Sequence, residues 1–368
     1  MSAPGQFERL LPALHEAVAR IRPGASLVRV VPLGTDVEDH VATAKALGYG
    51  QPLRLELRTA DGRAETLVLH AAQPDAYGHD RRSDRAGSLL LAYDTFGSVP
   101  RHVRALDVGL LEPDGHLISL AHAGEPYLLT TWIPGREYAQ DLRRVARDAR
   151  LAPRDRARCE LLAHYLAELH ADRGGPAPVW RRAVRDLIGH GEGVFGIVDG
   201  FADDVPGAPR ARLDAIEQAC VAWRPRLRAR SHRLARTHGD FHPFNVLFDD
   251  AGNLGLLDAS RGGRGDPADD VACMAINYVF FALGSPRAWP GALGALWASF
   301  FRAYLEATGD HELFEVIAPF LAWRALVLAS PAWYPELSAE ARDRLLGLAE
   351  RALAAEVFDP TWADALFA

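Results

Sequence analysis

The feature that most constrains the fold of this chain is a set of polar residues placed around two short apolar segments near residue 250. Asp240 and Asn245 come at the start of the first segment, residues 245–248, and Asp258 ends the second segment, residues 254–258. The residues Asp-Asp-Ala-Gly between the segments favour a tight turn, so the pattern predicts a β-hairpin. Folding this hairpin would return Asp258 to the side of Asn245, with Asp240 next to both.

These three side chains have the chemistry of a phosphotransfer site. Carboxylate and carboxamide oxygens are hard ligands that suit Mg²⁺ held between a protein and substrate phosphates. Phosphoryl transfer requires metal ions that bridge phosphate oxygens and a carboxylate that orients and deprotonates the attacking hydroxyl. Asp240, Asn245 and Asp258 supply these groups.

The spacing of these residues resembles that of a known family. The sequence His-Gly-Asp-x-x-x-x-Asn at residues 238–245, followed by Asp258, is similar to the catalytic loop of the aminoglycoside phosphotransferase/choline kinase family. The sequence Gly-Asp-Pro-x-x-Asp at residues 265–270 resembles a second motif of that family. The resemblance implies a two-lobed, protein-kinase-like fold. It also implies transfer of the γ-phosphate of ATP or GTP, with Mg²⁺, to a hydroxyl group of a small metabolite or antibiotic.

The resemblance assigns a role to each matching residue. It implies that Asp240 is the catalytic base and that Asn245 and Asp258 are the Mg²⁺ ligands. His238 would anchor the loop. Asp270 would begin a helix and brace the catalytic loop, and the proline before it fits a helix start on capping grounds.

The first part of the chain has the pattern of a small antiparallel sheet. Alternating apolar and polar residues predict strands over residues 26–33, 52–59 and 65–72, with an Asp-Gly turn between the last two. A helix is expected to begin near Ser83, and a further strand is expected over residues 127–133. The rest of the chain has mainly helical periodicity.

These patterns predict an α+β protein with a small antiparallel-sheet N-lobe and a larger, mainly helical C-lobe. We expect an N-terminal helix within residues 1–25 and a nucleotide-binding N-lobe over residues 26–133. Residues 134–368 would form the C-lobe, with the catalytic loop and the acceptor-binding helices.

Nucleotide binding is where the sequence departs from the family pattern. Kinases of this fold usually hold phosphate with a strand Lys paired to a helix Glu, and this chain has His70 and Asp84 at those places. A His70–Asp84 pair would substitute, because a carboxylate favours the charged imidazolium. The alternative is that His70 is an ordinary strand residue and that Arg81, Arg82 or Arg264 holds phosphate.

The strand over residues 127–133 would be the hinge by resemblance. There the main chain of Thr131, Trp132 and Ile133 would meet the purine, although ordinary packing is an equal explanation for Trp132. No clear glycine-rich loop joins the first two strands, because the glycines in that region are scattered through an insert: Gly34, Gly48 and Gly50.

Composition excludes several other classes of function. The net charge of −7 argues against a nucleic-acid-binding surface. Lys45 is the only lysine and does not end a glycine-rich turn, so a Walker A loop is excluded. No apolar run is long enough to span a membrane, and the N-terminus reads as an amphipathic helix rather than a signal peptide. We therefore expect a soluble, cytoplasmic protein that acts on small molecules.

Two competing functions remain open at this point. The missing lysine fits a pseudokinase that binds a nucleotide or a partner without transfer. A metal-dependent hydrolase would use His238, Asp240 and His242 as zinc ligands, although no further matching histidine pair is present. Arg324 lies in an apolar run and needs a partner, for which a structural carboxylate is favoured over a substrate anion.

Overall fold

The computed structural model describes residues 4–33, 52–75, 77–259, 261 and 263–368. The chain divides into two compact units, residues 1–130 and 131–368. Gly34, Gly48 and Gly50 of the predicted insert, and Lys45, lie outside the described residues.

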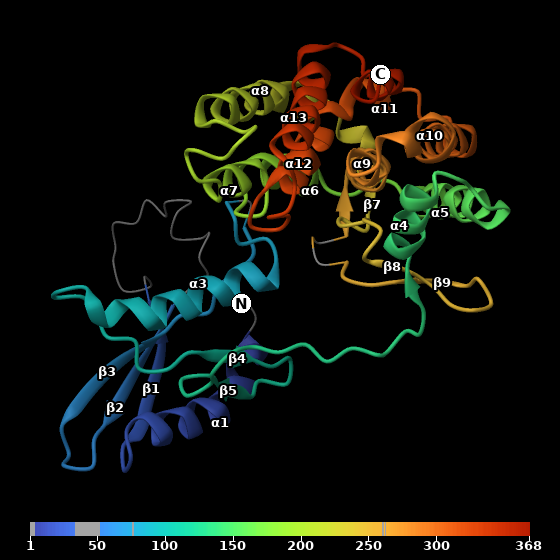
Figure 1. The fold of residues 1–368 in the computed structure, drawn as a ribbon. Coiled ribbons are helices and arrows are strands. Elements are labelled where there is room, and N and C mark those ends of the chain that lie inside the picture. Colours follow the sequence, from blue (N-terminus) through green and yellow to red (C-terminus); the bar gives the residue numbers. More distant parts are fainter. Residues whose placement is uncertain (1–3, 34–51, 76, 260, 262) are drawn as a thin grey trace. The chain divides into compact units, whose positions relative to one another are not determined.

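The first unit combines small antiparallel sheets with helices (Figure 1). Its sheets have the strand orders β1-β2-β3 and β4-β5. The predicted hairpin is present as β2 and β3, paired from Leu53↔Leu69 to Arg58↔Ala64. Its elements are α1 (Pro4–Ile21), β1 (Ser26–Pro32), β2 (Leu53–Arg58), β3 (Ala64–Leu69), α3 (Arg82–Thr95), β4 (Gly109–Leu111) and β5 (Leu117–Ser119).

The N-terminal helix provides the core of this unit. Leu10, Leu14 and Val18 recur on one face of α1 and are buried against alternate residues of the central strand β2. This is the contact expected when a helical stripe covers the apolar face of a sheet. The helix α3 begins near Ser83 as predicted, but it has no buried residue.

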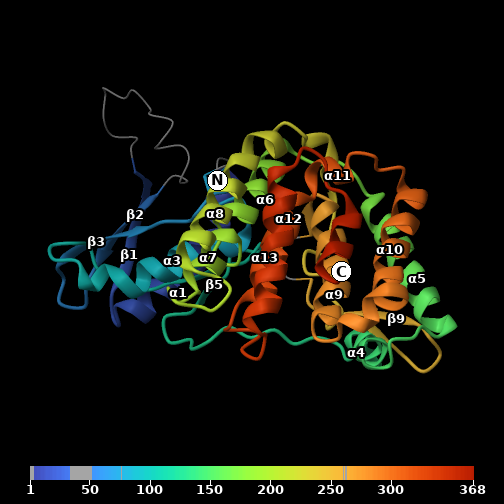
Figure 2. The same cartoon turned by 45° about the horizontal axis from the view of Figure 1, so that its top comes forward.

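The second unit is mainly helical, with short strands (Figures 1 and 2). The helix α9 runs through its centre and packs against α12, α10 and α4; nearly all of its side chains are buried. Its helices are α4 (Tyr138–Asp148), α5 (Pro153–His170), α6 (Ala177–Gly189), α7 (Val194–Asp199), α8 (Arg210–Arg228), α9 (Ala268–Leu283), α10 (Gly294–Thr308), α11 (Leu313–Val316), α12 (Ala318–Ala329) and α13 (Ala339–Ala354). Its strands are β6 (Arg136–Glu137), β7 (Ala235–Arg236), β8 (Val246–Phe248), β9 (Leu254–Leu256) and β10 (Arg264–Gly265).

The hairpin predicted near residue 250 is present as β8 and β9. Val246 pairs with Leu256 and Phe248 with Leu254, and β6 adds a third strand on the other side of β8. The residues of β8 are buried, whereas those of β9 are partly exposed. The hairpin is thus anchored by one strand inside an otherwise helical unit.

The predicted strand over residues 127–133 is wrong. These residues form no strand in the structure, and the side chain of Trp132 is 88% exposed. The segment crosses the boundary between the two units. Its apolar pattern suits a strand, but a strand forms only where a partner strand offers its hydrogen-bonding edge, and the described residues provide none here.

The two units together confirm the expected α+β class, with small antiparallel sheets and many helices. Among the described residues, no helix is both long enough and apolar enough to cross a membrane.

Candidate active site

The hairpin register sets the spacing of the predicted metal ligands. The main-chain N–H of Leu257 donates to the carbonyl oxygen of Asn245 at 2.9 Å, which extends the β8–β9 ladder by one step. Asp258 is therefore one residue beyond the position opposite Asn245. The sequence prediction that the hairpin returns Asp258 towards Asn245 agrees with this register.

Asp240 lies on the loop before β8 and contacts Asn245 directly. The Asn245 Nδ2 donates to the main-chain oxygen of Asp240 at 3.1 Å, and it lies 3.4 Å from Asp240 Oδ2. His242 Nδ1 accepts the main-chain N–H of Phe244 at 3.2 Å, so its Nε2 carries the proton. That Nε2 is 3.4 Å from Asp240 Oδ2.

The other oxygen of Asp240 is held by an arginine from a distant helix. Arg324 of α12 donates through Nη1 to Asp240 Oδ1 at 2.6 Å. Its Nη2 donates to the carbonyl oxygen of Gly239 at 2.8 Å and to Asp269 Oδ1 at 2.7 Å. Arg324 is buried. The carboxylate partner favoured from the sequence is therefore present, and one of its two carboxylates is the predicted catalytic base.

The surroundings of Asp240 keep its side chain ionised. Burial opposes ionisation, but the hydrogen bond with His242 and the positive charges of Arg324 and Arg261 outweigh it. Together they hold the pKa of the Asp240 carboxyl well below its usual range. Asp240 is thus a carboxylate at neutral pH, with Oδ1 held by Arg324 and Oδ2 facing only the weaker contacts.

The loop before Asp240 is held by a buried carboxylate. Asp270, in the first turn of α9, accepts the main-chain N–H groups of His238 and Gly239 at 2.7 Å each. His170, the last residue of α5, lies with Nε2 3.1 Å from Asp270 Oδ2. The hydroxyl oxygen of Tyr304, from α10, lies 2.8 Å from His170 Nδ1. The loop is therefore fixed to three helices.

Gly239 has a conformation that explains the glycine in the motif. Its φ is +86°, in the region that side-chain-bearing residues rarely adopt. A Cβ at this position would lie 2.8 Å from Arg261 Cβ. A larger residue would therefore strain the backbone and displace Arg261, which contacts Asp240.

Asp258 lies two residues after the end of β9, is exposed, and has a left-handed backbone conformation, with φ +54°. Within the described residues its carboxylate has no hydrogen-bond or ion-pair partner. Aspartate tolerates this conformation better than most residues. An exposed carboxylate with no protein partner is available for a ligand or a metal ion.

The donor set of Asn245 and Asp258 fits a magnesium ion. Because Asn245 uses its Nδ2 for Asp240, its Oδ1 remains available to a metal ion, and Asp258 offers carboxylate oxygens. Mg²⁺ typically uses one or two protein carboxylates and completes its coordination with water and phosphate. An amide oxygen and one free carboxylate match that requirement.

The same residues do not support the zinc hydrolase. His238 Nδ1 accepts the main-chain N–H of Asp240 at 3.3 Å, and its Nε2 is buried. In the parts of the chain that the structure describes, no group of three His, Cys, Asp or Glu side chains is placed to hold a metal ion.

The predicted His70–Asp84 pair is not formed. His70 is exposed just after β3 and has no hydrogen-bond partner in the described part of the chain. The Asp84 carboxylate instead accepts the main-chain N–H of Arg81 at 2.8 Å. An acidic residue at the third position of a helix is well placed to satisfy the free N–H at the helix start, and this local bond takes the carboxylate. A role for His70 in nucleotide binding stays a prediction.

The predicted hinge residues lie at the start of the second unit. Ile133 is next to the hairpin, because a Cβ at Gly255 would come within 2.5 Å of Ile133 Cγ2. Thr131 and Trp132 are exposed. Contact of their main chain with a purine stays a prediction.

Several contacts of the site were not identified from the sequence, which proposed His242 only as a zinc ligand. His242 and Arg261 contact Asp240, and His170 contacts Asp270. A histidine at the end of an apolar helix and an arginine shortly after Asp258 were the available signals. Neither signal indicates which carboxylate the residue meets.

Comparison with known proteins places this site in a family. A model of the phosphotransferase enzyme family matches residues 98–320, more than half of the chain. No functionally curated protein matches the chain in sequence.

Among solved structures, the chain is similar to a glucosamine kinase, with 18% identity, a TM-score of 0.42, and coverage of 91% of this chain and 93% of that one. It is also similar to the choline kinase LicA from Streptococcus pneumoniae, with 13% identity, a TM-score of 0.35, and coverage of 94% of this chain and 98% of that one. A third similar structure is the macrolide 2'-phosphotransferase MphH from Brachybacterium faecium, with 19% identity, a TM-score of 0.29, and coverage of 91% of this chain and 98% of that one. On the family match, which covers the catalytic-loop motif and the Gly-Asp-Pro motif, the chain belongs to the phosphotransferase enzyme family.

Proposed function

We propose that this protein is a Mg²⁺-dependent small-molecule kinase that transfers the γ-phosphate of ATP or GTP to a hydroxyl group of a small metabolite or antibiotic. The observation that carries the proposal is the meeting of Asp240 and Asn245 before β8, with Asp258 just beyond the residue opposite Asn245. Family membership supports the coarser assignment to phosphotransferases.

Asp240 would orient the attacking hydroxyl. Its Oδ1 is held by Arg324, so Oδ2 is the oxygen left to accept a hydrogen bond from the acceptor. The depressed pKa makes this carboxylate a weak base. It would therefore take the hydroxyl proton late, once bonding to phosphorus has made the hydroxyl more acidic. Late proton transfer fits the loose transition state of phosphoryl transfer.

Asn245 and Asp258 would hold the metal ion through amide and carboxylate oxygens. A metal ion held by these two residues would supply positive charge that offsets the negative charge developing on the transferred phosphate. The contact from Asn245 Nδ2 to the Asp240 main chain fixes the amide group through its nitrogen and leaves its oxygen for the metal ion. His238 and Asp270 would support the site by fixing the loop, and Asp84 by starting α3.

His70 of the first unit and the main chain of Thr131, Trp132 and Ile133, at the start of the second unit, would contact the nucleotide. The helices of the second unit would carry the acceptor. The aromatic residues of the C-terminal helices are mostly buried. They would therefore act in the core that holds these helices together, and not as direct contacts to the acceptor.

The test is nucleotide turnover by the purified protein, measured as ADP or GDP release against a panel of small hydroxyl compounds with Mg²⁺. The replacement Asp258→Ala should abolish release. Because the side chain is exposed and has no partner among the described residues, the expected cost to the fold is limited to the strain of alanine at φ +54°. Asp204→Ala removes another exposed carboxylate of the second unit and should leave turnover unchanged. Unchanged turnover in Asp258→Ala would refute the metal assignment.

The second candidate is a nucleotide-binding or partner-binding protein without transfer. The observation that favours it is that His70, which stands where a phosphate-binding lysine is expected, has no charged partner among the described residues. Nucleotide binding that requires Mg²⁺, together with no turnover on any acceptor and no effect of Asp240→Asn, would favour this function instead.

A further inference from the structure

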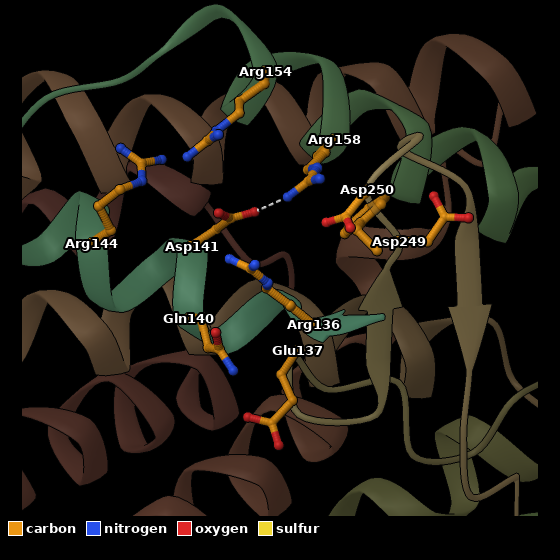
Figure 3. Close-up of a pocket in the computed structure, with 10 residues that line it drawn as sticks. Arg136, Glu137, Gln140, Asp141, Arg144, Arg154, Arg158, Asp249 and Asp250 are labelled. Atoms are coloured by element: carbon orange, nitrogen blue, oxygen red, sulfur yellow. Dashed lines mark hydrogen bonds and ion pairs between the residues drawn. The ribbon is translucent and has the colours of Figure 1, made fainter. Parts of the chain in front are cut away.

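We propose that a cavity in the second unit, separate from the proposed active site, binds the phosphate group of a small anion. The cavity has a volume of about 300 Å³. It is lined by β6, α4, the first half of α5 and the turn between β8 and β9 (Figure 3). This volume is at the lower end of the range for small-molecule sites.

The first observation is an excess of arginine around one carboxylate. In Figure 3, Arg136, Arg154 and Arg158 extend from two different elements towards Asp141. Among the residues that the structure describes, Arg158 alone forms an ion pair with it. The side chains of Arg136 and Arg154 form no hydrogen bond or ion pair with any residue that the structure describes. Three guanidinium groups thus share the space around one carboxylate.

A fourth arginine of the lining is used elsewhere. Arg144 is paired with Asp155, and Asp155 also accepts the main-chain N–H of Ala152 at 2.7 Å and so caps α5. This buried carboxylate is therefore committed to the helix start and to Arg144. It is not available to neutralise Arg136 or Arg154.

The other acidic residues of the lining do not balance the arginines at this point. Both carboxylate oxygens of Asp249 accept hydrogen bonds at 2.8 Å from Asn253 within the hairpin turn. The carboxylate of Glu137 points away from Asp141 in Figure 3. Asp250 is exposed. Equal numbers of acidic and basic side chains line the cavity, but the positive charge is concentrated around Asp141.

This arrangement suits a phosphate oxyanion. A guanidinium group presents a rigid fork of N–H donors that matches phosphate geometry, and neighbouring positive charges repel one another until an anion is bound. The guanidinium of Arg158 lies 4.3 Å from the centre of the Phe248 ring. This stacking and the bond to Asp141 hold one of the three arginines in place before binding.

The cavity is at the end of β8 that is remote from the proposed catalytic residues. Asn245 precedes this strand, whereas Phe248 and Asp249 of the lining end it. The proposal does not depend on kinase activity.

The test is calorimetric titration of the full chain with inorganic phosphate and, separately, with pyrophosphate at constant ionic strength. EDTA is present so that no divalent metal ion contributes. The double replacement Arg136→Gln/Arg154→Gln removes the two unpaired arginines. The control Arg156→Gln/Arg224→Gln removes the same charge from exposed helix positions outside the lining. All four arginines are exposed, so both variants should fold, as circular dichroism will check.

We expect saturable binding of one anion per chain. It should be at least about tenfold weaker in Arg136→Gln/Arg154→Gln, since two charge-assisted contacts are lost, and within about twofold of wild type in the control. Asp258→Ala should bind as wild type does. Non-saturable binding, equal weakening in both double variants, or loss in Asp258→Ala would overturn the proposal.

Discussion

Replacing Arg324 by glutamine should weaken the fold and change the ionisation of Asp240 at the same time. The Arg324 side chain is 5% exposed, and those of its partners Asp240 and Asp269 are 16% and 18% exposed. The replacement removes donors at 2.6, 2.7 and 2.8 Å and leaves two carboxylates without their cation. Breaking a buried pair in this way costs about 3–5 kcal/mol, out of the roughly 5–15 kcal/mol typical of a folded protein.

The assay is urea unfolding together with the pH profile of kcat/KM at a temperature where the variant is folded. Loss of the guanidinium should raise the pKa of Asp240, so the acid limb of the profile should move to higher pH. Adding Asp269→Asn to the variant should recover part of the stability, because it removes one stranded carboxylate.

The matched control is Arg342→Gln. Arg342 is also buried, but it donates to the main-chain oxygens of Ala329, Pro206 and Leu337 rather than to carboxylates. It should lower stability without moving the pH profile. The reasoning is refuted if Arg324→Gln costs less than about 1 kcal/mol, or if both arginine variants shift the profile equally.

Two further outcomes follow from the loop geometry. Gly239→Ala should destabilise the protein by about 1–2 kcal/mol from backbone strain alone and should lower turnover. The control Gly347→Ala lies within α13, where a Cβ meets only ordinary contact, and should stabilise the protein by about 0.5–1 kcal/mol. Equal unfolding midpoints of the two variants in urea would count against this prediction. The pKa of Asp240 is lower in the folded state than in the unfolded chain. The ionised Asp240 therefore contributes its full stabilisation above the unfolded-state pKa near 3.9, and this stabilisation is lost as the pH falls through the folded-state pKa. The difference in stability between wild type and Asp240→Asn should therefore be constant above about pH 5 and shrink below about pH 4, and a difference that grows on acidification would contradict the assigned direction.

Local patterns predicted the local structure well. The Asp-Gly turn and the alternating residues around it specified the β2–β3 hairpin, and the turn at residues 249–252 specified β8–β9. Both hairpins depend on contacts between residues close in sequence, which turn chemistry and alternation encode directly. The same reasoning failed for residues 127–133, because a strand also needs a distant partner that its own sequence does not describe.

The sequence by itself determined the family, the order of the chemical groups around Asp240, and the hairpin that brings Asp258 towards Asn245. Only the tertiary structure decided which residues surround those groups. Arg324 meets Asp240 from 84 positions away in the sequence, and Asp270 meets His170 across 100 positions. Such contacts arise when buried charges find partners during packing. The sequence shows that a buried arginine needs a carboxylate, but only the fold selects Asp240 as that carboxylate.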